Sequence, residues 1–196
     1  EPGPHKIQGI GAGFKPDVIV VVATIRSLKM NGGVPKTELA KENLDALSIG
    51  LANLKQHIDN CQSFGVPVVV GLNRFTQDTK KEVELTMEKC ADLGVEVVES
   101  TVWEHGSKGG MKLAQKVVEI IGKVPSNFHH LYEDSMPLWD KIETVAKKIY
   151  RAGKVETDKR VRNKLDALEK AGYGDLPVCM AKTQYSFSSD PTLLGA

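Results

Sequence analysis

The sequence predicts an α/β fold with a mostly parallel sheet and helices on both of its faces. Apolar, β-branched runs recur three times, at residues 17–23, 66–72 and 95–98. Such short runs are typical of strands that are buried on both faces. Each run is followed by a longer segment in which apolar residues recur every three or four positions, as in amphipathic helices. This alternation implies right-handed crossovers between parallel strands.

The helices predicted between and after these strands have recognisable ends. The first opens at Thr37 and extends to about residue 64. Asp78 or Thr79 can cap the second, which ends near residue 94. A third helix is expected over about 110–121, which completes the third repeat of strand and helix.

Beyond residue 122 the alternation changes. Residues 124–136 are expected to form an irregular connection, and 138–150 an amphipathic helix. A further helix is predicted from residue 158 to about 172, and a last strand over 176–181. We expect residues 15–196 to form a single α/β domain, a size that allows one sizeable core.

The composition is that of a globular chain of 196 residues with a formal net charge of +1. This balance gives no electrostatic basis for binding nucleic acid or an anionic membrane surface, so neither partner is expected. No apolar run approaches the roughly 20 residues that span a bilayer, and the first residues lack the pattern of a signal peptide. We therefore expect a cytoplasmic protein.

The three cysteines, Cys61, Cys90 and Cys179, are widely spaced and form no CxxC pair. This spacing argues against a disulfide framework and against a zinc site. We expect three buried structural thiols and no metal site.

Two aromatic residues follow neighbouring predicted strands. Phe75 comes after the run at 66–72, and Trp103 comes after the run at 95–98. Ligands of parallel sheets bind at the loops after the strands, so both rings are expected to face one crevice. A flat bicyclic ligand would gain about 0.5–1.5 kcal/mol per stacking contact beyond the area that it buries. From the residues alone, the alternative is that Phe75 is a core residue and Trp103 a loop anchor.

Cations and glycines form a second group of candidates. Arg26, Lys29 and the Gly32-Gly33 pair follow the first predicted strand, and together they suit a phosphate or a carboxylate. Two solvated surface cations are the simpler alternative. Lys182 and Thr183 follow the last predicted strand, and they too are expected to point towards a crevice at a strand end. The sequence singles out no catalytic residue.

Four segments of the chain, 23–33, 66–75, 99–110 and 179–188, resemble motifs of the later part of formate–tetrahydrofolate ligase, in the same order. The resemblance extends from about residue 15 to residue 196. It implies a Rossmann-like core related to that of P-loop NTPases. The full family enzyme joins formate to tetrahydrofolate through formyl phosphate, with ATP and Mg²⁺.

The resemblance also implies roles for the candidate residues. Phe75 and Trp103 match the aromatic residues that hold the pterin of the folate. The nucleotide and formyl-phosphate side is assigned to Arg26, Lys29, Gly32, Gly33, Lys182 and Thr183. The family usually has histidine where this chain has Asn31, which leaves a donor role at that point open.

The ATP site of the family depends on a P-loop, and no GxxxxGK[ST] pattern occurs in these 196 residues. Phosphoryl transfer relies on positioning and charge stabilisation of the phosphates. We therefore expect a fragment that carries the folate side of the site, binds folate and nucleotide as small molecules, and is inactive alone. A homo-oligomer is left open as its assembly.

The first residues resemble a different family. Residues 3–14 are similar to a segment of cysteine synthase, whose pyridoxal chemistry is not expected here because its Schiff-base lysine and phosphate loop are missing. We treat 1–14 as a foreign-looking segment, which suggests a chimera joined near residues 13–16; a chance local likeness is the alternative. An engineered or chimeric α/β scaffold without activity is the rival interpretation of the whole chain.

Overall fold

The computed structural model describes residues 14–180 and residue 187. By their internal contacts these residues separate into two compact units. One unit contains residues 16–128, and the other contains residues 14–15, 129–180 and 187. The expectation of a single α/β domain over 15–196 stays a prediction, since compactness alone does not define a domain.

Residues 16–128 are built on a three-stranded parallel sheet with the order β1-β2-β3. The strands are β1 (Ile19–Ala23), β2 (Val68–Asn73) and β3 (Val97–Ser100). In the register of the sheet, Val20 pairs with Val69 and Gly71 pairs with Val98. The predicted parallel α/β class is confirmed, and each strand begins two residues later than the sequence predicted.

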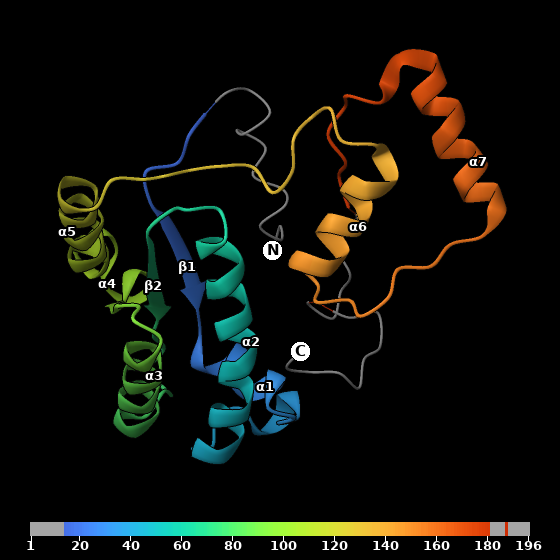
Figure 1. Cartoon of the computed structure of the whole chain (residues 1–196). Coiled ribbons are helices and arrows are strands. Elements are labelled where there is room, and N and C mark those ends of the chain that lie inside the picture. Colours follow the sequence, from blue (N-terminus) through green and yellow to red (C-terminus); the bar gives the residue numbers. More distant parts are fainter. Residues whose placement is uncertain (1–13, 181–186, 188–196) are drawn as a thin grey trace. The chain divides into compact units, whose positions relative to one another are not determined.

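Helices cover both faces of this sheet (Figure 1). The helices α2 (Leu44–Gln62) and α3 (Lys80–Asp92) connect the strands and pack against each other. Helix α5 (Ser107–Lys123) lies on the opposite face, where a Cβ added at Gly71 would come within 2.9 Å of the Leu113 side chain. The absence of a side chain at Gly71 therefore lets α5 approach β2 closely.

The core of this unit lies between the sheet and the α2–α3 layer. Alternate residues of β2 point into it, as the period of a strand requires. The buried core cluster consists of Ala23, Ile25, Leu28, Leu47, Leu51, Leu54, Ile58, Val70, Leu72, Val83, Cys90 and Val95. Both predicted strand–helix units of this layer are thus confirmed by their packing.

Two short helices follow β1 and β3. Helix α1 (Ile25–Asn31) occupies a segment in which the sequence analysis predicted no helix, and α4 (Val102–His105) directly precedes α5. The missed signal for α1 was Thr24, whose side chain accepts a hydrogen bond from the Ser27 backbone at 3.1 Å as an N-cap.

Helix α2 begins later than predicted. Thr37 lies in a short 3-10 turn (Lys36–Glu38), and the helix starts only at Leu44. The physical reason is the cap: Asn43 Oδ1 accepts a hydrogen bond from the Ala46 backbone at 2.9 Å. For α3, Thr79 rather than Asp78 is the cap, and it forms a reciprocal capping box with Glu82.

The second unit contains α6 (Leu138–Lys148) and α7 (Lys159–Leu168), followed by a π-helical turn (Glu169–Tyr173). Both predicted helices of this region are confirmed. The strand predicted over 176–181 is wrong for 176–180, and residue 181 lies outside the described residues. Carbonyls before and within this segment bond to a side chain instead: the buried Lys141 donates to Gly174 and Leu176 at 2.7 and 3.1 Å. In the part of the chain that the structure describes, no helix is both long and apolar enough to cross a membrane.

Candidate functional site

The candidate site lies at the edge where the three parallel strands end. Because β1, β2 and β3 run in the same direction, the segments that follow them emerge at one edge of the sheet. These segments are α1, the loop over 74–79, and α4. They carry Arg26, Phe75 and Trp103, which the sequence analysis expected at strand ends.

The structure brings Phe75 and Trp103 together. Their ring centroids are 5.7 Å apart, with an interplanar angle of 27°. Phe75 is half-buried, and Trp103 is 52% exposed, so the pair lies at the surface rather than in the core. The rings stack directly on each other instead of lining two sides of an open crevice.

Trp103 is held against the strand that leads to Phe75. Its indole Nε1 donates to the carbonyl oxygen of Arg74 at 2.9 Å. Arg74 is itself fixed, since its backbone N–H donates to the Ser100 carbonyl at 2.9 Å and its guanidinium pairs with Glu99 at 2.8 Å. The position of the indole therefore follows from the pairing of β2 with β3.

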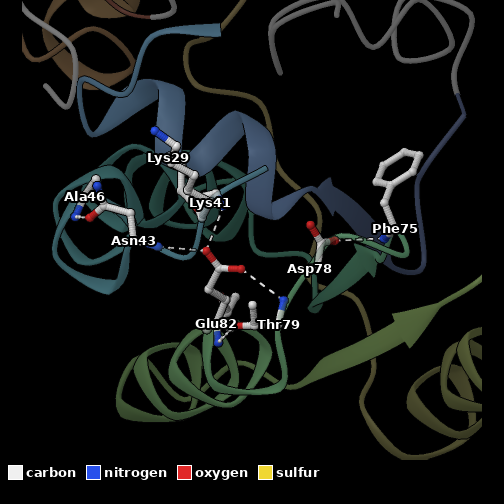
Figure 2. Close-up of polar contacts among 9 residues, drawn as sticks. Lys29, Lys41, Asn43, Ala46, Phe75, Asp78, Thr79 and Glu82 are labelled. Carbon is white, nitrogen blue, oxygen red and sulfur yellow. Dashed lines mark hydrogen bonds and ion pairs between the residues drawn. The ribbon is translucent and has the colours of Figure 1, made fainter. Parts of the chain in front are cut away.

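The backbone of Phe75 is held by Asp78. The Phe75 backbone N–H donates to Asp78 Oδ2 at 2.8 Å, and the Asp78 backbone N–H donates to the Phe75 carbonyl at 3.0 Å (Figure 2). Asp78 is buried, and burial raises the pKa of its carboxyl above the ordinary value, against the lowering effect of the Phe75 hydrogen bond.

Lys29 lies inside the fold. Its side chain is fully buried, and its ammonium donates to Glu82 Oε1 at 2.7 Å and to the Lys41 carbonyl at 2.9 Å (Figure 2). The same carboxylate accepts the backbone N–H groups of Asn43 and Thr79 at 3.1 and 3.0 Å. In this conformation the Lys29 ammonium is committed to an internal ion pair and is not presented to a ligand.

These partners also set the protonation of Glu82. Burial by itself would raise the pKa of this carboxyl. The hydrogen bonds from Lys29, Thr79 and Asn43, together with the Lys29 charge, outweigh burial and hold the pKa below its usual range. Glu82 therefore stays ionised at neutral pH and joins α1, the 41–43 segment and the start of α3.

The remaining nucleotide-side candidates are placed differently from one another. Arg26 is exposed on α1, and Gly33 has a φ of +93°, which favours glycine. Gly32 lies where α1 meets α2: a Cβ there would come within 1.8 Å of the Ala46 carbonyl oxygen. Lys182 and Thr183 lie outside the described residues. A close helix contact thus explains the glycine at position 32 without any ligand.

Sequence reasoning missed Asp78 and Glu82 as parts of this region. The Thr79-Lys-Lys-Glu82 spacing matches the capping-box pattern and could have identified Glu82 as a residue at a helix start. Its pairing with Lys29, 53 residues earlier, carries no sequence signal.

Two of the three cysteines lie where they were expected. Cys61 and Cys90 are buried, and burial raises the pKa of each thiol to about 11. The prediction is wrong for Cys179, which is exposed. Within residues 14–180, no group of three or more His, Cys, Asp or Glu side chains could hold a metal ion.

The parallel sheet and its covering helices define an α/β protein with an aromatic pair at the carboxyl edge of the sheet, and comparison with known proteins identifies the family. The model of the formate–tetrahydrofolate ligase family matches residues 5–196. This chain belongs to that family.

Curated relatives agree with the family match. Formate–tetrahydrofolate ligases of Hyphomonas neptunium and Ruegeria sp. are 58% and 55% identical to the chain over 185 residues, and that of Pelagibacter ubique is 50% identical over 183 residues. The matches cover 94%, 94% and 93% of this chain and 33% of each relative. The chain therefore spans about a third of the length of these relatives.

The comparisons correct one expectation about the first residues. The family match begins at residue 5 and so includes most of the segment over 1–14 that was interpreted as foreign. The chimera, and with it the resemblance of residues 3–14 to cysteine synthase, is unsupported. A twelve-residue glycine-rich stretch is too short to establish ancestry, and that is why the interpretation failed.

Proposed function

We propose that this chain is a fragment of a formate–tetrahydrofolate ligase that carries the folate side of the enzyme's site. The observation that supports this proposal most directly is the stacked pair of the half-buried Phe75 and the exposed Trp103 at the carboxyl edge of the sheet. Family membership gives the ligand its chemistry, because the pterin of tetrahydrofolate is a flat bicycle that stacks on aromatic rings.

The geometry of the pair limits how a pterin binds. Each stacking contact needs about 3.5 Å between planes, so a ring inserted between the two side chains needs roughly 7 Å. The centroids are only 5.7 Å apart. Insertion therefore requires the rings to separate by more than about 1 Å. We expect the Phe75 ring to move, because the Trp103 side chain is hydrogen-bonded to the Arg74 carbonyl.

Substitution of Phe75 tests the folate proposal. In a Trp139→Phe background, Trp103 is the only tryptophan, and we expect tetrahydrofolate to quench its fluorescence with weak, saturable affinity. Phe75→Ala should weaken that binding about tenfold, which corresponds to roughly 1.4 kcal/mol of lost stacking and burial.

Met111→Ala is the matched control, because Met111 is an exposed apolar residue on α5 of the same unit. It should leave the affinity unchanged. Quenching that does not saturate, or that is equal with and without the Phe75 ring, would show that the aromatic pair only packs the surface.

The chain alone is proposed to be inactive as a ligase. Its sequence contains no GxxxxGK[ST] pattern, the signature of the phosphate loop on which ATP binding in the family depends. We expect no measurable ATP-dependent formation of formyltetrahydrofolate by the purified chain, measured by the acid-induced conversion of the product to a chromophore. Sustained turnover above the rate without protein would refute this expectation.

The nucleotide side of the site stays a prediction. It rests on Arg26, Gly32, Gly33, Lys182 and Thr183, with Lys29 able to contribute only after leaving Glu82. ATP and Mg²⁺ as ligands, a homo-oligomeric assembly and a cytoplasmic location are likewise proposals that follow from the resemblance and the composition.

A further inference from the structure

We propose that Asp78 is a positioning residue of the folate side: its carboxylate fixes the backbone of Phe75 and so sets the Phe75 ring against Trp103. The inference rests on the proposed folate site for its ligand readout, and on the described contacts alone for its structural readout.

The first argument is that Asp78 forms hydrogen bonds with both the backbone N–H and the backbone carbonyl of Phe75. Its carboxylate accepts the Phe75 N–H at 2.8 Å, and its own N–H donates to the Phe75 carbonyl at 3.0 Å. These two bonds close the 75–78 turn on itself. Rotation of the Phe75 backbone, which would swing the ring away from Trp103, therefore requires that at least one of them break.

The second argument is that different groups hold the two rings, on the two sides of the peptide unit that joins Arg74 to Phe75. Trp103 is fixed through Arg74 to the pairing of β2 with β3. Phe75 follows Arg74 directly, but its backbone is held by Asp78, the residue before the α3 cap Thr79. The 5.7 Å stack thus depends on Asp78 for one ring and on the sheet for the other.

The third argument is that Asp78 itself has little freedom. It is buried beside Arg74, Lys29 and Glu82, whose charges act on its carboxyl, and the next residue is locked in the capping box. A buried acceptor of a backbone N–H leaves that donor unsatisfied when it is removed. Asn can still accept the bond through its amide oxygen, whereas Ala cannot.

The experiment compares Asp78→Ala and Asp78→Asn in the Trp139→Phe background. Asp78→Ala should weaken tetrahydrofolate binding about tenfold, like Phe75→Ala, and Asp78→Asn should stay within about twofold of the parent. Combining Asp78→Ala with Phe75→Ala should weaken binding no further than Phe75→Ala alone, because both changes act through one ring. Additive effects of about a hundredfold would overturn the proposal, as would an Asn variant as weak as the Ala variant.

A ligand-free readout separates this inference from the folate proposal. Amide hydrogen exchange measured by NMR should show a protected Phe75 N–H in the parent and in Asp78→Asn, and a much faster exchange in Asp78→Ala. Fast exchange of this amide in the unsubstituted chain would overturn the proposal, and this measurement does not depend on whether a variant folds. If tetrahydrofolate does not bind the parent at all, the folate proposal fails, and the exchange data still decide the role of Asp78.

Asp92→Ala is the matched control. Asp92 lies at the other end of α3, is exposed, and makes a long surface contact to Lys89 at 4.0 Å. It should change neither tetrahydrofolate binding nor the exchange of the Phe75 amide. An equal effect of both aspartates would show a general loss of stability and would refute a specific role for Asp78.

Discussion

Replacing Lys29 with methionine is expected to lower the free energy of unfolding by about 3–5 kcal/mol, because it leaves the buried carboxylate of Glu82 without its cation. Both side chains are almost completely buried, and the carboxylate keeps only two backbone N–H donors. A loss of this size is a large part of the 5–15 kcal/mol that typically stabilises a domain. Urea unfolding monitored by circular dichroism measures it.

Two further variants make this prediction specific. Lys80→Met removes an exposed cation that pairs with Glu84 across one helical turn, and should cost less than about 1 kcal/mol. Adding Glu82→Gln to Lys29→Met removes the unpaired charge and should recover part of the stability, with a coupling energy of about 0.5–3 kcal/mol; the glutamine oxygen can accept only one of the two backbone N–H groups that now bond to separate carboxylate oxygens. If Lys29→Met costs no more than Lys80→Met, the buried ion pair is not present in solution.

The same ion pair makes stability depend on pH in a defined direction. The pKa of Glu82 is lowered in the folded state, so its contribution is present above its unfolded pKa, near 4.5, and is lost as the pH falls through the folded value. Asp78 acts in the opposite sense, because its raised pKa makes its ionisation unfavourable to the fold as the pH rises above 3.8. Lys29→Met should therefore lose less stability on acidification than the parent chain.

Much of the fold could be predicted from the sequence because its signals are local. Continuous apolar runs and three- to four-residue periodicity marked all three strands and the helices α2, α3 and α5. Helix α1 was missed because its seven residues are too few for a clear period, and only the cap at Thr24 indicated it. The prediction of a strand at 176–181 is wrong for 176–180. Lys141, more than 30 residues earlier, donates hydrogen bonds to carbonyl groups before and within this segment, and such a distant partner carries no local sequence signal.

The candidate site was predictable only in part. Spacing after the strands indicated that Phe75 and Trp103 lie at one edge of the sheet, but it did not indicate that the two rings stack directly on each other. Composition and spacing could not show that Lys29 is buried, because a lysine after a strand is usually solvated. Its partner Glu82 comes from a different helix, so the pair forms only because α1 packs on α2 and α2 packs on α3.

Gly50→Ala is expected to destabilise the chain by about 2–3 kcal/mol, although helix propensity alone predicts a gain of about 1 kcal/mol. Gly50 lies in α2 where α1 crosses it, and a Cβ there would come within 1.8 Å of the Leu28 carbonyl oxygen. Gly32 makes the reciprocal approach to Ala46. Both obstacles are backbone atoms, which cannot rotate aside as a side chain can, so the helices must separate.

Gly122→Ala in α5 is the matched control for this steric effect. Its added Cβ would meet no atom within 4 Å, so we expect a gain of up to about 1 kcal/mol from helix propensity alone. The two substitutions are chemically identical and both lie in helices, so opposite signs in urea unfolding isolate the contact between α1 and α2. A stabilised Gly50→Ala would mean that α1 does not pack this closely on α2 in solution. The ion pair of Lys29 with Glu82 would then lose its support as well, because α1 carries that lysine into the core.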